Sequence, residues 1–467
     1  MVKWISRLLL ALMPVAALAT PDVDAMQEAA LATLVDLIRL DTSQPAGNEI
    51  IAAEYLARRL NAAGINAEII EPVPGRASIV ARLVGNQSKP PILLLGHTDV
   101  VTVEPENWSF DPFSGTVSEG RIFGRGAADD KGIVAASLEV LLALKAHNIQ
   151  LDRDVIFLGV ADEEAGGTLG ITYLVEHHLN KIAAEFAINE GGRGYFDDAT
   201  GEYVAFEIST AEKTPRRARL IAQGRAGHGS VPTPDNPVGI IARAVARLFD
   251  TPLPMELNET TRAFFTRLAV TRPHAEAEIY RAILAPNPGL DVQEQLRAIN
   301  PSFYSIIRTS VVPTIIQGGY QRNVIPSSAE ATLDIRALPG TDPEVLFDQI
   351  GTIIGDPAVS IEPLAVTRPA HLPSPLDTAL FRAFEKVVSE RHPKAAVLPN
   401  MLTGATDSAQ LRAAGIPTYG FGPGLALGEN NGIHGNDEYL RVDAYQEYVR
   451  LLWLVVNEVA AGDQSRM

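Results

Sequence analysis

Apolar residues follow two different periods in the first third of the chain. Helical spacing, ended by polar or glycine residues, predicts three helices at 26–40, 47–64 and 130–147. Short continuous apolar runs at 90–96 and 154–160 predict buried strands. The alternation of helices with fully buried strands is typical of a mostly parallel sheet that helices cover on both faces. We therefore expect an α/β domain here.

The pattern changes near residue 211. Shorter strand-like and helical stretches follow, and a glycine-rich segment at 223–237 lies after the first of them. The predicted strands are at 216–222, 329–338 and 358–366, and the predicted helices are at 238–249 and 342–354. We interpret this region as a small two-layer α+β unit inserted into the first domain.

The predicted domain boundaries follow these changes. A chain of 467 residues exceeds one ordinary core, so an insertion is expected. The parent domain comprises 20–211 and 369–467, where helix and strand alternate again, and the inserted domain comprises 212–368. The predicted fold class is α/β, with a mostly parallel sheet, helices on both faces and an inserted α+β unit.

Composition and charge narrow the class of partner. The chain is 46% hydrophobic and 20% charged, as in a globular protein. Its formal charge of −17 argues against nucleic acid or an anionic membrane as a partner, because both favour basic surfaces. With 0 cysteines the chain forms no disulfide and has no thiol nucleophile. Any metal would be held by histidines and carboxylates.

The first residues have the pattern of a secretory signal. Lys3 and Arg7 precede an apolar stretch that is too short to span a bilayer. The small residues Ala17 and Ala19 follow it. An ordinary amphipathic helix would need a polar face that this stretch lacks. We expect cleavage after Ala19, a periplasmic or secreted protein, and no stable membrane anchor after cleavage.

Histidines and carboxylates follow or flank strand-like runs in five stretches. The stretches are "GHTDV" (His97, Asp99), "GRGAADDKG" (Asp129, Asp130), "GVADEEAGG" (Asp162, Glu163, Glu164), "AINEGG" (Glu190) and "GIHGNDE" (His434). One such residue at a strand end is ordinarily a solvated loop residue. Five at corresponding places, beside glycines that permit close backbone approach, indicate a site where the strands end.

These motifs resemble, in order and spacing, a family of co-catalytic zinc peptidases. The family includes glutamate carboxypeptidase, aminoacylase, carnosinase-type dipeptidases, acetylornithine deacetylase and succinyl-diaminopimelate desuccinylase. Residues 309–340 and the long segment before them look most like its carboxypeptidase S branch, which also holds secreted N-acyl amino acid hydrolases. The resemblance covers nearly the whole chain after residue 19. It implies that the inserted domain serves as a lid or dimerisation domain.

The resemblance implies two Zn²⁺ per subunit, which Co²⁺ or Mn²⁺ can replace. Asp129, favoured over Asp130, would bridge the metals, with a cis peptide often found just after it. His97 and Glu190 would complete one site, and Glu164 and His434 would complete the other. Two divalent metals with these two neutral histidines and three carboxylates would keep about one positive charge. That charge would lower the pKa of a shared water.

Two acidic residues are expected to assist the metals. Asp99 lies near enough in sequence to accept the ring N–H of His97 that faces away from the metal. Glu163, next to Glu164, is expected to take a proton from the bridging water and later pass it to the leaving amine.

The resemblance also assigns residues outside the metal motifs. His228 would reach the active site of a partner subunit and stabilise the oxyanion there. Asn323 and Arg336 would hold the carboxylate of the substrate, and the planar fork of arginine suits that function. Gly404 and Thr406, in "TGATDS", match a loop that contacts the substrate.

We therefore expect an enzyme that cleaves an amide bond next to a free carboxylate. Its substrate is a small peptide, as for a carboxypeptidase or dipeptidase, or alternatively an N-acyl amino acid, as for an aminoacylase. The two classes differ in whether the substrate carries a free α-amino group. A binding protein that keeps the fold without catalysis is the remaining alternative, and the complete set of ligands with Glu163 argues against it. The resemblance allows a homodimer through the inserted domain.

Overall fold

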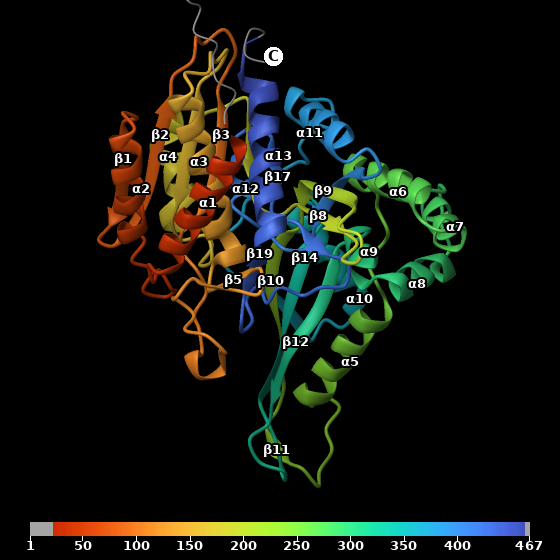
Figure 1. The fold of residues 1–467 in the computed structure, drawn as a ribbon. Helices are drawn as coiled ribbons and strands as arrows, with labels where there is room; N and C mark the ends of the chain where they lie inside the picture. The colour runs from red at the N-terminus through yellow and green to blue at the C-terminus, as the bar shows by residue number, and fades with distance from the viewer. Residues whose placement is uncertain (1–21, 463–467) are drawn as a thin grey trace, which may run out of the picture.

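A computed structural model describes residues 22–462 in two main parts, a broad parent domain and a narrow inserted domain that projects from it (Figure 1). The predicted signal segment lies outside the described residues. Among those residues, no helix has the length and apolar character needed to cross a membrane.

The parent domain contains a mixed, largely parallel sheet. The strand order is β1-β2-β6-β3-β7-β17-β9-β8-β18, and β16 pairs with β9. The bounds are β1 Ala67–Val73, β2 Arg76–Leu83, β3 Ile92–His97, β6 Val155–Val160, β7 Phe186–Asn189, β8 Arg193–Phe196, β9 Tyr203–Glu212, β16 Ala396–Leu402, β17 Thr418–Gly420 and β18 Leu425–Ala426. β3 lies between β6 and β7 and is parallel to both.

Helices cover both faces of this sheet, which confirms the predicted fold class. One face packs against α1 (Val23–Ile38), α2 (Ile50–Ala62), α3 (Gly132–Ala146), α11 (Ala379–Arg391) and α13 (Val442–Ala460). The other face packs against α4 (Tyr173–Ile182) and α12 (Ser408–Ala413). Along β3, Ile92 and Leu94 enter the first core while Leu93 and Leu95 enter the second. Burial on both faces explains why this strand is a continuous apolar run.

The inserted domain, called the lid below, has an antiparallel sheet in the order β12-β14-β10-β15. Its strands are β10 Thr214–Gln223, β12 Ser310–Gly318, β14 Ser328–Ala337 and β15 Val359–Pro363. α5 (Pro237–Asp250) and α10 (Pro343–Ile354) pack on one face of the sheet around a separate hydrophobic core. At the far end, β11 (Gly227–His228) pairs with β13 (Val324–Ile325), as Figure 1 shows. This is the two-layer α+β arrangement predicted for the inserted unit.

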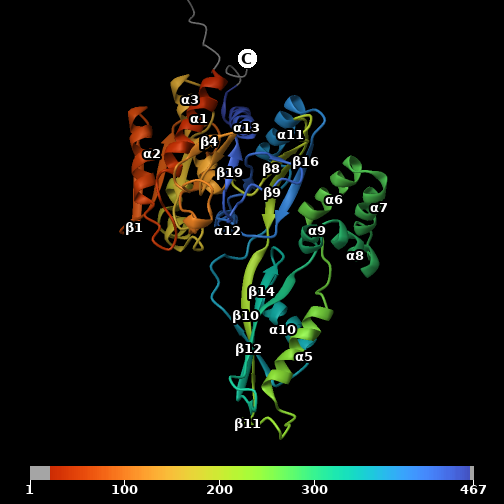
Figure 2. The same cartoon turned by 60° about the horizontal axis from the view of Figure 1, so that its bottom comes forward.

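Four helices between α5 and β12 depart from the expectation of a single inserted unit. They are α6 Glu259–Thr271, α7 His274–Ile283, α8 Leu290–Ile299 and α9 Pro301–Ile306. Phe264, Phe265 and Leu268 of α6 share a core with Leu398 and Met401 of β16. Figure 2 shows these helices beside β16 and the parent domain. Part of the range 212–368 therefore packs against the parent sheet, because the apolar face of α6 finds its partner there.

A small sheet and the strand connections complete the parent domain. β4 (Thr116–Ser118), β5 (Arg121–Phe123) and β19 (Tyr439–Arg441) form a three-stranded antiparallel sheet that joins the early and late parts of the chain. The strand pair β1 and β2 forms an antiparallel edge that the apolar pattern did not predict. The chain passes between the parent sheet and the lid after β9 and after β15, and again before and after α6 to α9, which pack on the parent sheet.

Candidate metal centre

Three neighbouring parallel strands deliver the predicted ligands to one edge of the parent sheet. His97 is the last residue of β3, Glu164 follows β6, and Glu190 directly follows β7. Asp129 lies in the turn that enters α3, and His434 lies in the loop before β19. Because parallel strands end on the same side of a sheet, residues that are distant in sequence meet there.

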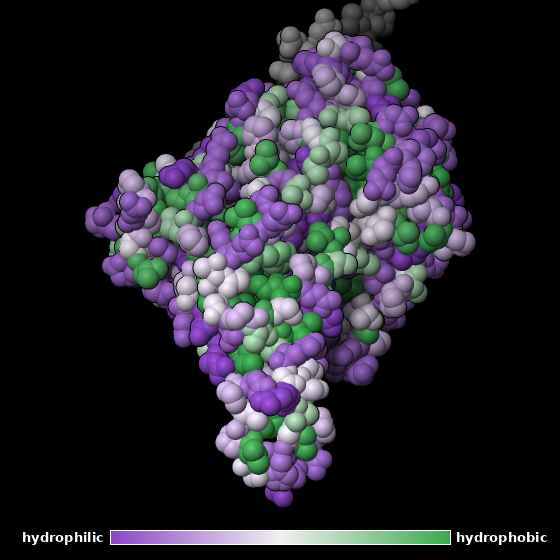
Figure 3. All heavy atoms as spheres, turned by 180° about the vertical axis from the view of Figure 1, so that it is seen from behind, coloured by the Kyte–Doolittle hydropathy of each residue, from purple (hydrophilic) through white to green (hydrophobic). Residues whose placement is uncertain are grey.

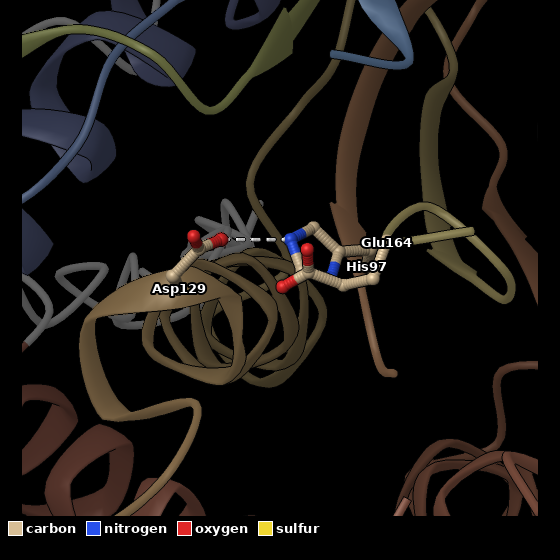
Figure 4. Close-up of side chains that lie close together, drawn as sticks. All are labelled: His97, Asp129 and Glu164. Carbon is tan, nitrogen blue, oxygen red and sulfur yellow. Dashed lines mark hydrogen bonds and ion pairs between the residues drawn. The ribbon is translucent and has the colours of Figure 1, made fainter. Parts of the chain in front are cut away.

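Asp129 lies between the two histidines. Its Oδ1 is 2.9 Å from Nε2 of His97, and its Oδ2 is 3.2 Å from Nε2 of His434. His434 Nε2 is also 3.2 Å from Glu164 Oε1, while His97 Nε2 is 3.8 Å from Glu190 Oε1. Figure 4 shows His97, Asp129 and Glu164 pointing toward one another. One carboxylate oxygen of Asp129 therefore faces each half of the cluster.

Asp130 is oriented differently from Asp129. The peptide between them is cis, as expected from the resemblance. The Oδ2 atom of Asp130 accepts a hydrogen bond from the backbone N–H of His97 at 3.1 Å, and the side chain is fully buried. Asp130 thus holds the end of β3, while Asp129 faces the histidines.

Burial and crowding of acids dominate the electrostatics. Burial, together with the charges of Asp129 and Glu163, raises the pKa of Glu190 well above its usual range. Burial alone would lower the pKa of His97, but its hydrogen bond to Asp129 and the nearby Asp99 and Glu190 raise it well above normal. Buried carboxylates at this density are stable as anions only beside a cation.

The donor set fits divalent metal ions. Ligand atoms of His97, Asp129 and Glu164 lie within 4.8 Å of one another, and so do those of His97, Glu163 and Glu190. Imidazole nitrogens and carboxylate oxygens without thiolates suit Zn²⁺, Co²⁺ or Mn²⁺. Sharing of His97 between the two groups agrees with a compact centre rather than two separate sites.

The role of Asp99 differs from the prediction. Nδ1 of His97 is 2.9 Å from the backbone carbonyl oxygen of Asp99, whereas the nearest carboxylate oxygen is 3.6 Å away. A carbonyl only accepts, so Nδ1 carries the proton and Nε2 is left to bind a metal. The Asp99 carboxylate instead accepts hydrogen bonds from the backbone N–H groups of Glu163 and Glu164, at 3.0 and 3.1 Å. It orders the loop that carries both acids.

Glu163 has a partner that the sequence motifs did not reveal. Nη2 of Arg368 lies 2.5 Å from Oε1 of Glu163, and Nη1 lies 2.7 Å from Oδ1 of Asp407. Burial raises the pKa of Glu163 well above its usual range, and the charge of Arg368 opposes that shift. Arg368 follows β15 in a segment without helix, strand or motif signal. Only the fold brings it to the loop of Asp162, Glu163 and Glu164, called the DEE loop below.

A cavity of about 240 Å³ opens beside the cluster. Asp129 and Glu190 line it, and so do Gly404 and Thr406. The hydroxyl of Thr406 donates to Glu212 at 2.9 Å, so its side chain also holds the loop in place. The two residues assigned to substrate contact thus share a cavity with the metal ligands.

Of the three predicted residues of the lid, His228 and Asn323 are neighbours at the tip, and Arg336 lies apart from them. His228 is exposed at the tip, and its Nδ1 is 2.7 Å from Oγ of Ser230. Asn323 is exposed beside it, since its carbonyl accepts from the N–H of Gly229 at 2.7 Å. Arg336 pairs with Asp334 near the parent end of β14. The strand β14 spans about 30 Å, so the structure does not bring Asn323 and Arg336 together within one chain.

Comparisons with known proteins agree with this geometry. The profile of peptidase family M20/M25/M40 matches residues 93–458. A probable carboxypeptidase S-like 2 of Dictyostelium discoideum is 28% identical over 374 residues, 78% of this chain and 70% of that protein. The human N-fatty-acyl-amino acid synthase/hydrolase PM20D1 is 30% identical over 387 residues, 80% and 75% of the two chains. The crystal structure of Sso-CP2, an M20 family metallo-carboxypeptidase from Sulfolobus solfataricus, aligns with a TM-score of 0.69 at 22% identity, over 92% of this chain and 99% of that one.

Proposed function

The chain belongs to peptidase family M20/M25/M40 and is a peptidase or amidohydrolase, and we propose that it is a dizinc enzyme that cleaves an amide bond next to a free carboxylate. The observation that carries this proposal is the position of Asp129, with one carboxylate oxygen toward each histidine. Glu190 and Glu164 complete the two halves of the cluster. Two metals held by these residues would each have a histidine, a carboxylate of its own and a share of Asp129.

The residues of the chain divide the catalytic tasks between them. Zn²⁺ held by this donor set would polarise the scissile carbonyl and lower the pKa of a water molecule. Glu163 lies beside the cluster and takes a proton from that water at its carboxylate, then delivers it to the nitrogen of the leaving amine. Glu164 and Glu190 would serve as metal ligands. Asp99 keeps the loop of Glu163 in register through its backbone hydrogen bonds.

The lining of the cavity favours an N-acyl amino acid over a peptide with a free α-amino group. Among residues 22–462, the carboxylates that line it are Asp129 and Glu190, which are assigned to metals, so no other lining acid is present to hold an ammonium group. Apolar residues and one cation, Arg193, also line it. Burial of an unpaired ammonium is costly, whereas a neutral acyl group enters such a cavity readily. The human relative named as an N-fatty-acyl-amino acid synthase/hydrolase supports the same choice.

Matched substrates test the substrate class. The zinc-loaded protein is incubated with a dipeptide and with its N-acetyl and longer N-acyl counterparts that share one C-terminal amino acid, whose release is measured. We expect kcat/KM to be higher for the N-acyl compounds. A clear preference for the dipeptide would assign the enzyme to the dipeptidase class, and failure to release the amino acid from any of them would contradict the proposed reaction.

We also propose that the lid tip acts in a second subunit. Along β14 the tip lies about 30 Å from the parent end of the lid, so His228 and Asn323 would serve a metal centre in a partner chain. Apolar side chains near the tip are exposed, including Val231, Ile316 and Tyr320. Figure 3 shows hydrophobic residues among polar ones where the molecule narrows to the tip. A homodimer through the lid would cover them and complete two active sites.

Export is a separate proposal. The charged, apolar and small-residue order of residues 1–19 supports a periplasmic or secreted protein. Fractionation of producing cells, with the intact mass of the exported protein, tests it. A mass that corresponds to a chain beginning at Thr20 is expected, and an uncleaved protein in the cytoplasm would contradict the proposal.

A further inference from the structure

We propose that Arg368 is a positioning residue for the catalytic acid–base group, which it holds in a single orientation and links to the segment that returns from the lid. This inference rests on the proposed role of Glu163. It concerns how the side chain is held, which no motif in the sequence assigns.

The guanidinium group of Arg368 contacts Glu163 twice. Nη2 is 2.5 Å from the carboxylate Oε1 and 3.0 Å from the backbone oxygen of the same residue. A donor that binds both ends of one residue fixes its side-chain torsions as well as its charge. Among residues 22–462, Oε2 of Glu163 accepts no hydrogen bond, so one oxygen is held and the other remains to exchange a proton.

The other edge of the guanidinium is also occupied. Nη1 donates to Oδ1 of Asp407 at 2.7 Å and to Oε1 of Gln410 at 3.2 Å. Arg368 is 5% exposed, Glu163 is 8% exposed and Asp407 is fully buried. A planar fork that serves a carboxylate on each side is a property of arginine that lysine does not share. Arg368 therefore joins the DEE loop to the loop of Gly404 and Thr406.

Two glycines of the DEE loop make room for this contact. At Gly167 an added Cβ would lie 2.9 Å from Asp407 Oδ1 and 3.1 Å from Nη1 of Arg368. At Gly166 it would lie 2.9 Å from Cβ of Thr367. Both glycines have positive φ, 106° and 74° in chain order. The glycines of "EEAGG" thus leave room for the return segment, residues 364–373, to pack against Glu163.

The return segment links the contact between Arg368 and Glu163 to the lid. It leaves the lid after Pro363, where the N–H of Leu364 bonds to the carbonyl of Arg217, and it enters the parent sheet where the N–H of Ser374 bonds to the carbonyl of Thr210. Arg368 lies between these two anchors. The orientation of Glu163 therefore depends on the position of residues 364–373, which connect the lid to the parent domain.

A second buried arginine provides a matched control. Arg153 is 3% exposed and pairs with Glu185 at 2.7 Å, but it lies before β6 and Glu185 lies before β7, at the opposite end of the strands from the metal cluster. Loss of either arginine removes a buried guanidinium and its ion pair, and the partner of Arg153, Glu185, is exposed. Only loss of Arg368 should affect the chemistry.

The experiment compares Arg368→Gln, Arg368→Lys and Arg153→Gln in the zinc-loaded enzyme. For Arg368→Gln we expect close to full zinc content, kcat lowered about a hundredfold and KM changed less than about threefold, because a misplaced acid–base group slows the step but leaves binding intact. Arg368→Lys should recover only part of kcat. Arg153→Gln should lower the melting temperature and keep kcat. Full kcat in Arg368→Gln would overturn the proposal, and if that variant does not fold, full kcat in Arg368→Lys would overturn it.

Combination with Glu163→Gln separates this inference from the proposed function. If Arg368 acts through Glu163, its loss in the Glu163→Gln background should reduce kcat no further. If the double variant loses kcat by the product of the two single factors, the positioning role of Arg368 is contradicted, but the role of Glu163 is not. Wild-type kcat in Glu163→Gln itself would instead contradict the acid–base assignment. In the metal-free protein, the melting-temperature shifts of Arg368→Gln and Glu163→Gln should be non-additive, while those of Arg368→Gln and Arg153→Gln should add.

Discussion

The metal cluster and the lid tip each hold predicted functional residues, and they are built in opposite ways. The residues of the cluster are buried or half-buried, except for the exposed His434, and they meet within one chain because β3, β6 and β7 end side by side. The tip is exposed, and His228 and Asn323 lie about one strand length from Arg336 at the parent end of the lid. Sheet topology, together with the turn of Asp129 and the loop of His434, brings the first group together within one chain, whereas the fold of one chain leaves the second group apart.

The largest expected effect comes from the residue at the centre of the cluster. Asp129→Ala should lose most bound zinc and lower activity at least about ten-thousandfold, because Asp129 faces both halves of the centre. Asp130→Asn is the matched control, since Asp130 is buried beside it but holds only the backbone of His97. Elemental analysis and kcat/KM measure both. A fully active Asp129→Ala enzyme, or one that keeps both metals, would break the account of the cluster.

The next effect tests whether the tip serves another chain. His228→Ala should lower kcat by about a hundredfold to a thousandfold, the range for loss of an oxyanion donor. Mixed dimers of His228→Ala and Glu163→Gln subunits should regain part of the activity, because one of the two sites then has both groups intact. Mixed dimers isolated with two different affinity tags provide the sample. If such dimers stay inactive, the tip does not act across subunits.

A smaller effect concerns Arg336. Its pairing with Asp334 at 2.7 Å means that the arginine is not left unpaired without substrate, so its contribution should be near a single charge-assisted hydrogen bond. Arg336→Ala and amidation of the substrate carboxylate should each lower kcat/KM by about tenfold to a hundredfold. Combined, they should lower it little further. Equal rates on the acid and its amide with the wild-type enzyme would show that no carboxylate is recognised.

The smallest effect concerns Lys213, which is buried between β9 and β10, where the parent domain meets the lid. Burial, together with the charges of Arg336 and Arg308, lowers the pKa of Lys213 to about 7. In the unfolded chain this pKa is about 10.4, so between about pH 7 and 10 the unfolded state binds more protons and folding stability rises with pH. Lys213→Met should raise the melting temperature at pH 7 by a few degrees and flatten this dependence. Lys394→Met, an exposed control, should change neither, and an unchanged profile in Lys213→Met would contradict the assignment.

The sequence predicted most of the fold because its apolar periods are set by burial. The runs at β3 and β6 are continuous since both faces of each strand are covered. The helices α6 to α9 were placed with the lid, because sequence order says nothing about which sheet an apolar helix face contacts. The antiparallel strands β1 and β2 at one side of the sheet are not predicted for a similar reason, since their pairing is set by their neighbours.

At the site, the residues that meet in the cluster are predictable because strand ends and short motifs fix their positions. The hydrogen bond of His97 to a carbonyl rather than to the Asp99 carboxylate depends on backbone geometry. Arg368 could not be found from a motif, because it meets Glu163 only after the chain has passed through the whole lid. Its single signal is an arginine in a segment without secondary structure, a common occurrence.

Paired measurements on Glu163→Gln and Glu164→Gln test the central claim most directly, since the two acids are adjacent in sequence but are assigned different tasks. Zinc per subunit and kcat are measured on the same preparations. Glu163→Gln should keep close to two zinc ions and lose at least about a thousandfold in kcat with little change in KM, because it lacks the group that transfers the proton. Glu164→Gln should lose zinc from one half of the centre. Loss of zinc from Glu163→Gln together with full zinc in Glu164→Gln would contradict the assignment of base and ligand.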